Sequence, residues 1–85
     1  MVAEIIIYST LVCPYCTQAK RLFDYKGVGY TEIRIDKEPT KVAEMVKKSG
    51  GRRSVPQIFI GDTHIGGFDD LKALNDMGKL DEILK

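Results

Sequence analysis

Two cysteines, Cys13 and Cys16, have the residue type and spacing for redox chemistry, and they are the only cysteines of the sequence. A C-x-x-C pair beside a β-α-β pattern is typical of a thiol–disulfide exchange site. As a structural crosslink the pair would close a very short loop and add little stability. Half of a zinc site is the other alternative, but such a site needs four ligands and only His64 remains. The pattern therefore predicts redox chemistry.

The neighbouring residues predict unequal roles for the two thiols. Pro14 suits the first position of a helix, because its missing N–H group needs no partner there. Cys13 would then be the N-cap, with its sulfur facing free N–H groups and the positive end of the helix dipole. Both effects favour the thiolate, so we expect a lowered pKa for Cys13 and a more buried Cys16 one turn further on. Cys13 is predicted to attack and Cys16 to resolve.

Hydrophobic periodicity and turn residues predict the elements that position this pair. Strands are expected over residues 4–8, 30–35, 57–60 and 63–65. Helices are expected over residues 14–26, from a start within 36–39 to Gly50, from Phe68 to Gly78, and over 80–84. Their inward faces would carry Ala19, Leu22, Phe23, Val42, Met45, Val46, Leu71, Leu74 and Met77. This order predicts an α/β fold with a four-stranded mixed sheet, in which the first three strands are parallel and a hairpin adds an antiparallel edge.

Size and charge narrow the class of protein. The 85 residues suffice for one domain spanning residues 1–85, and a net charge of +1 argues against strong binding to nucleic acid or anionic lipid. The apolar run Ile5-Ile6-Ile7 is too short for a signal peptide or a membrane span. We therefore expect a cytoplasmic monomer without membrane or nucleic-acid partners.

Three motifs together resemble the dithiol glutaredoxins, and most closely the short bacterial ones. They are Cys13-Pro14-Tyr15-Cys16 followed by Ala19-Lys20, then Ser54-Val55-Pro56, and then Gly66-Gly67-Phe68-Asp69-Asp70. Thioredoxins typically carry Gly-Pro between the cysteines instead. The resemblance covers essentially the whole chain, and it implies a thioredoxin-like fold with Pro56 in the cis form.

The resemblance also implies a glutathione site. The backbone of Val55, between Ser54 and Pro56, would pair with the cysteinyl part of glutathione. The helix start at Gly67 and Phe68 would receive the γ-glutamyl carboxylate. The α-amino group suits Asp69, while Asp70 either joins it or only stabilises the helix start. Tyr15 would cover the mixed disulfide from the rim.

One position departs from the family pattern. Many members place Lys or Arg three residues before the first cysteine, where this chain has Thr10. The glycyl carboxylate of glutathione needs a cation, and the candidates here are Lys20, Arg52 and Arg53. Each of them is equally well explained as a solvated surface charge.

The resemblance implies a glutathione-dependent oxidoreductase. Cys13 alone would reduce protein–glutathione mixed disulfides, and Cys13 with Cys16 would reduce protein disulfides, with glutathione as co-substrate and no metal. Ribonucleotide reductase is a partner known at the level of the family. One alternative is a glutathione-ligated [2Fe–2S] cluster carrier, against which Pro14, Tyr15 and the second cysteine argue. Another is a thioredoxin-like reductant that depends on a reductase.

Overall fold

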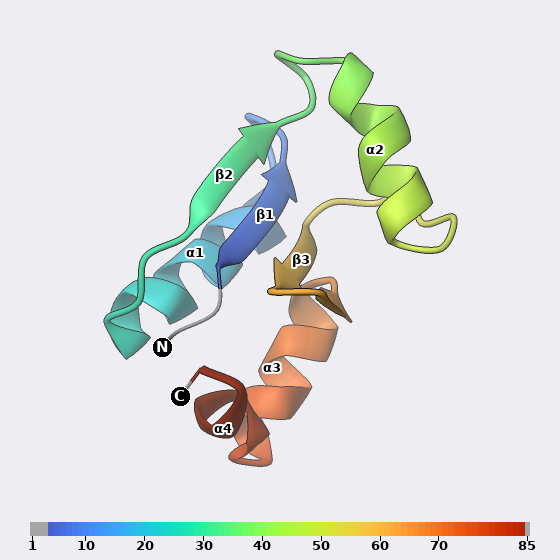
Figure 1. Ribbon diagram of the computed structural model, residues 1–85. Helices are drawn as coiled ribbons and strands as arrows, with labels where there is room; N and C mark the ends of the chain where they lie inside the picture. Colours follow the sequence, from blue (N-terminus) through green and yellow to red (C-terminus); the bar gives the residue numbers. More distant parts are fainter. Residues whose placement is uncertain (1–3, 85) are drawn as a thin grey trace.

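A four-stranded sheet in the order β2-β1-β3-β4 forms the centre of the molecule, with helices on both faces (Figure 1). The computed structural model describes residues 4–84. The elements along the chain are β1 (Ile5–Ser9), α1 (Pro14–Lys26), β2 (Thr31–Arg34), α2 (Thr40–Lys48), β3 (Gln57–Ile60), β4 (Thr63–Gly66), α3 (Phe68–Asp76) and α4 (Lys79–Leu84). The expected α/β class, mixed sheet and element order are confirmed.

The direction of β3 contradicts the expectation that the first three strands are parallel. β1 and β2 are parallel, but β3 pairs with β1 in the antiparallel sense, with Tyr8 opposite Gln57. The nine-residue helix α2 is about 13 Å long, whereas the connection over residues 49–56 has a reach of about 26 Å. That connection returns the chain to the end of the sheet where β1 finishes. The start of β3 therefore lies near the loop that leads to Cys13.

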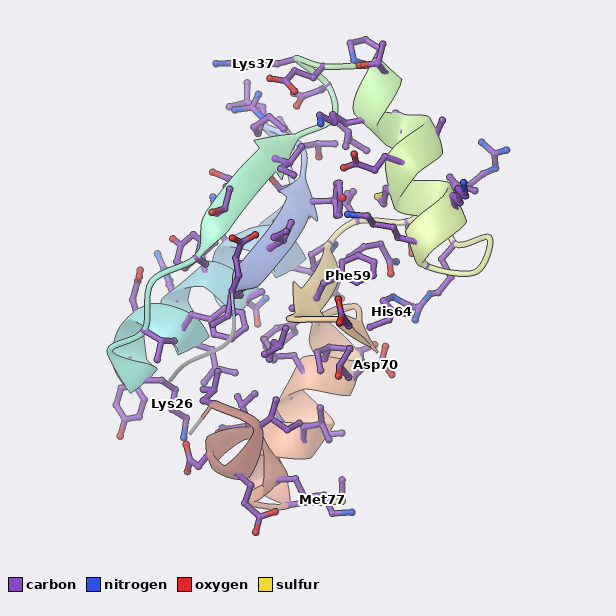
Figure 2. The ribbon with its side chains drawn as sticks, in the orientation of Figure 1. Lys26, Lys37, Phe59, His64, Asp70 and Met77 are labelled. Atoms are coloured by element: carbon purple, nitrogen blue, oxygen red, sulfur yellow. A yellow bond between two sulfur atoms is a disulfide. The ribbon has the colours of Figure 1, made fainter. Side chains whose placement is uncertain are left out.

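Two further expectations need correction. The helix α2 begins at Thr40, because Pro39 disfavours helical backbone in the residue before it. Met77 is 59 % exposed rather than inward-facing (Figure 2). It is the C-cap of α3, and the chain turns at Gly78 into α4, whose Leu80 fills the core instead.

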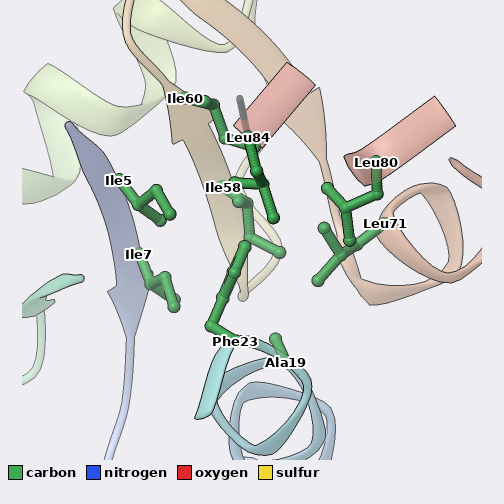
Figure 3. Close-up of a cluster of buried hydrophobic side chains, with 9 residues drawn as sticks. All are labelled: Ile5, Ile7, Ala19, Phe23, Ile58, Ile60, Leu71, Leu80 and Leu84. Carbon is green, nitrogen blue, oxygen red and sulfur yellow. The ribbon is translucent and has the colours of Figure 1, made fainter. Parts of the chain in front are cut away.

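Alternating side chains of β1 and β3 supply two hydrophobic clusters, one on each face of the sheet. The larger cluster joins the sheet to α1, α3 and α4, and it consists of Ile5, Ile7, Ala19, Phe23, Ile58, Ile60, Leu71, Leu80 and Leu84 (Figure 3). On the other face, Tyr8 and Phe59 pack with Met45 of α2. The larger cluster fixes α1 and α3 relative to the sheet, and the smaller one fixes α2.

Within residues 4–84, no helix combines the length and the apolar composition needed to cross a membrane.

Candidate active site

Cys13 is the N-cap of α1, as predicted. Its backbone is extended (φ −152°, ψ 93°) and Pro14 is the first helical residue. The Cys16 N–H donates to Cys13 Sγ over 3.1 Å, and a disulfide joins the two sulfurs. Cys16 is 1 % exposed, whereas Cys13 is half-buried. An approaching disulfide therefore reaches Cys13 first, at a position where N–H groups and the helix dipole stabilise a thiolate.

The loop before Cys13 is held by a residue that the sequence patterns did not single out. Asp36 Oδ2 accepts from the backbone N–H of Leu11 over 3.1 Å. Arg34 holds this carboxylate with two bonds of 2.7 Å, and these contacts keep the pKa of Asp36 well below its usual range. Because β1 and β2 are parallel, the residues that follow them meet at one end of the sheet. The predicted parallel pairing of these two strands was therefore the signal that could have placed Asp36 near the loop before Cys13.

A groove of about 290 Å³ lies between the first turn of α1, the start of β3 and the start of α3. Most of the predicted glutathione-site residues line it, namely Tyr15, Arg52, Ser54, Val55, Pro56, Gly67, Phe68, Asp69 and Asp70. The rings of Tyr15 and Phe68 stack across one end, with centroids 6.3 Å apart and planes 24° apart. Tyr15 is largely exposed, so the structure places it at the rim, where the sequence predicted it.

The segment before β3 forms one wall of the groove. The Val55–Pro56 peptide bond is cis, as the resemblance implied. Pro56 is buried while Ser54 is exposed, and the backbone of Ser54 and Val55 lies outside the strands of the sheet. This backbone is therefore positioned to pair with an extended ligand in the manner of an added strand.

The start of α3 forms the opposite wall, and Asp70 organises it. Asp70 Oδ2 accepts from the N-cap N–H of Gly67 over 3.0 Å and pairs with Arg52 Nη1 at 3.3 Å. Gly66 makes this approach possible, because its φ of 115° favours glycine and a Cβ there would collide with the Asp70 carboxylate. Asp69 is exposed, and none of the residues in the 4–84 range bonds to its side chain.

The structure separates the candidate cations. Arg52 lines the groove, whereas Arg53 is exposed outside it. Lys20 lies against β2, where its Nζ is 2.8 Å from the Glu32 carboxylate. The Thr10 hydroxyl donates to the Val12 carbonyl over 3.5 Å and is not part of the groove.

Comparison with known proteins decides the family. The family model described as Glutaredoxin matches residues 5–65. This chain belongs to the glutaredoxin family. It is similar to the glutaredoxin of Pseudomonas aeruginosa, with 51 % identity over 94 % of each chain. It is also similar to glutaredoxin 3 of Escherichia coli, with 52 % identity over 98 % of this chain and 99 % of the relative.

Solved structures confirm the thioredoxin-like fold of this glutaredoxin. A buckwheat glutaredoxin–glutathione complex superposes with a TM-score of 0.88 at 35 % identity, covering 96 % of this chain and 76 % of the buckwheat chain. The solution structure of a Brucella melitensis glutaredoxin gives a TM-score of 0.84 at 50 % identity, covering 99 % and 90 % of the two chains.

The family assignment establishes the activity. This glutaredoxin is a glutathione-dependent thiol–disulfide oxidoreductase that acts on glutathionylated proteins, with glutathione as co-substrate. Its Cys13–Cys16 pair is of the dithiol type. In the part of the chain that the structure describes, no three His, Cys, Asp or Glu side chains gather to hold a metal ion. The match to the glutaredoxin family sets aside the alternative of a reductase-dependent thioredoxin.

Proposed function

We propose that Cys13 is the attacking thiolate and Cys16 the resolving thiol. Cys13 Sγ would attack the glutathione sulfur of a mixed disulfide, and the protein thiolate would leave and take up a proton. A second glutathione thiolate would then attack the Cys13–glutathione disulfide, releasing glutathione disulfide and the Cys13 thiolate. Cys13 is a half-buried N-cap residue whereas Cys16 is fully buried, and this difference supports the assigned roles.

For a protein disulfide, both cysteines would act. Cys13 would form a mixed disulfide with the target, and Cys16 would attack Cys13 Sγ and release the target as a dithiol. The resulting Cys13–Cys16 disulfide is the form seen in this structure. Two glutathione molecules would reduce it and leave as glutathione disulfide.

We propose that the groove binds glutathione in an extended form. The backbone of Val55 would pair with its cysteinyl part, and the first-turn N–H groups of α3 would receive the γ-glutamyl carboxylate. Asp69 would bind the α-amino group, since its carboxylate is exposed at the same turn. Arg52 is the candidate cation that faces the groove, and we assign a glutathione carboxylate to it. Asp70 would act through Gly67 and Arg52, to which it is bonded.

Substitution of each cysteine tests this assignment. With a glutathionylated peptide as substrate, Cys13→Ser should have no turnover, because no other thiol occupies the N-cap position. Cys16→Ser should still remove glutathione from the peptide but lose the reduction of a protein disulfide. Activity that survives in Cys13→Ser, or equal losses of both reactions in Cys16→Ser, would contradict the assigned roles.

We further propose that residues 1–85 form one glutaredoxin domain that works as a cytoplasmic monomer. Ile5 and Leu84, near the two ends of the chain, share one hydrophobic cluster, which supports a single domain. A redox-active C-x-x-C pair suits a reducing compartment. Ribonucleotide reductase is a proposed target, since its reduction would use the dithiol reaction. Reduction of its disulfide by wild type and its failure with Cys16→Ser would test this partner.

The iron–sulfur alternative has less support. Cys16 lies one turn from Cys13 and forms a disulfide with it, so the second thiol competes with a cluster for Cys13. Anaerobic reconstitution followed by visible absorption tests it, and a stable coloured dimer would favour the carrier.

A further inference from the structure

Gln57 is a buried polar residue that the proposed mechanism does not use. It is the first residue of β3, directly after Pro56, and its side chain is fully buried at 0 % exposure. A buried amide is costly unless each of its polar atoms has a partner. In this fold both ends of the Gln57 amide are bonded: the nitrogen to Ser54, which lines the groove, and the oxygen to His64 of β4.

The bonds define the orientation of the amide. Gln57 Nε2 donates to the Ser54 carbonyl over 2.9 Å and to Ser54 Oγ over 3.2 Å. A carbonyl oxygen only accepts, so the nitrogen of the amide must face Ser54. The remaining atom, Gln57 Oε1, lies 2.8 Å from His64 Nε2, and His64 must therefore donate from Nε2. The chain of donors runs in one direction, from His64 through Gln57 to Ser54.

His64 is itself held in place. It is half-buried on β4 and packs against Phe59 (Figure 2), and the centroids of the two rings are 4.8 Å apart. Burial is the main cause that lowers the pKa of His64, with the charge of Arg52 adding to it and Asp70 opposing it. The neutral ring keeps its Nε2–H bond to Gln57, and the protonated ring has the same donor.

The backbone at Ser54 and Val55 lies outside the sheet, so the strand ladder does not hold it. We propose that Gln57 and His64 are positioning residues for glutathione, which hold the Ser54 carbonyl and hence the Val55 backbone in the binding conformation. The inference rests on the proposed glutathione groove. Loss of either bond would let the segment move and weaken glutathione binding, while Cys13 and its helix remain in place.

Steady-state kinetics with a glutathionylated peptide test the proposal. Gln57→Leu should raise KM by about two- to tenfold, the worth of one or two hydrogen bonds, with kcat within about twofold of wild type. His64→Phe should raise KM in the same direction, whereas His64→Gln, which keeps an N–H donor, should restore a KM near that of wild type. His64 is only half-buried, so its variants remain informative if Gln57→Leu folds poorly.

Tyr8→Phe is the matched control. Tyr8 is equally buried and lies opposite Gln57 in the sheet, but its hydroxyl donates to Glu44 of α2, away from the groove. A folded Gln57→Leu with an unchanged KM would overturn the proposal, as would an equal rise in KM for Tyr8→Phe or for His64→Gln. A separate variant tests whether the groove binds glutathione at all. If it does not, Asp69→Ala should have the same KM as wild type.

Discussion

Replacement of Gly66 by alanine perturbs the active site through the backbone. Gly66 has a φ of 115°, and an added Cβ would collide with the Asp70 carboxylate and lie 2.9 Å from Arg52 Nη1. The backbone strain costs about 1–3 kcal/mol. Displacing Asp70 also removes its bond to the Gly67 N–H, which is worth about 1 kcal/mol. We expect the free energy of unfolding of Gly66→Ala to fall by about 2–4 kcal/mol.

A matched glycine separates strain from collision. Gly27 also has a positive φ, of 72°, but an added Cβ there meets nothing within 4 Å. Gly27→Ala should cost about 1 kcal/mol, without any change in KM. Gly66→Ala should also raise KM for a glutathionylated peptide, because Arg52 and the start of α3 lose their common partner Asp70.

Urea unfolding followed by circular dichroism, together with steady-state kinetics, measures both effects. In an Asp70→Ala background the collision with the Asp70 carboxylate is absent and only the contact with Arg52 remains, so the Gly66→Ala change should cost less there than in wild type. Equal stability losses for Gly66→Ala and Gly27→Ala, or full additivity of the Gly66 and Asp70 changes, would refute the reasoning.

Two other perturbations test the charges around the site. Thr10→Lys should lower KM for a glutathionylated peptide by about two- to fivefold, since it adds an exposed cation where many family members have one; an unchanged KM would show that this position does not contact glutathione. His64 is the only histidine, and burial lowers its pKa below the ordinary value of 6.5. As the pH is lowered, His64 therefore takes up its proton at a higher pH in the unfolded chain than in the folded one. The free energy of unfolding should fall as the pH drops from about 7.5 to 5.5. Urea titrations at several pH values should show a smaller fall in the free energy of unfolding for His64→Gln. A fall identical to that of wild type would show that His64 does not cause it.

Local chemistry made the reactive centre predictable from the sequence. Within a helix, proline is favoured only in the first turn. Pro14 therefore marks Cys13 as the N-cap and places Cys16 one turn inside the helix. Gly27 marks the end of the same helix, since it takes the left-handed conformation. Such signals depend on residues close together in the chain, and they predicted both ends of α1 correctly.

The direction of β3 was decided by tertiary structure. The length of the connection after α2 permits either direction, and only packing of the chain selects the antiparallel one. This direction brings Ser54 to Pro56 to the end of the sheet at which Cys13 lies. A parallel β3 would have begun at the opposite end.

The sequence by itself determined the thiol chemistry, the unequal cysteines and the glutathione motifs, because each depends on residues close together in the chain. Tertiary structure alone decided which of the candidate cations faces the groove. Lys20 and Arg52 are both cations in the sequence, but in the fold Lys20 pairs with Glu32 while Arg52 faces the groove. The tertiary structure also brings His64 within hydrogen-bond distance of Gln57. These partners lie apart in the sequence, and the energy of an ion pair or a buried hydrogen bond depends on a distance that only the folded chain defines.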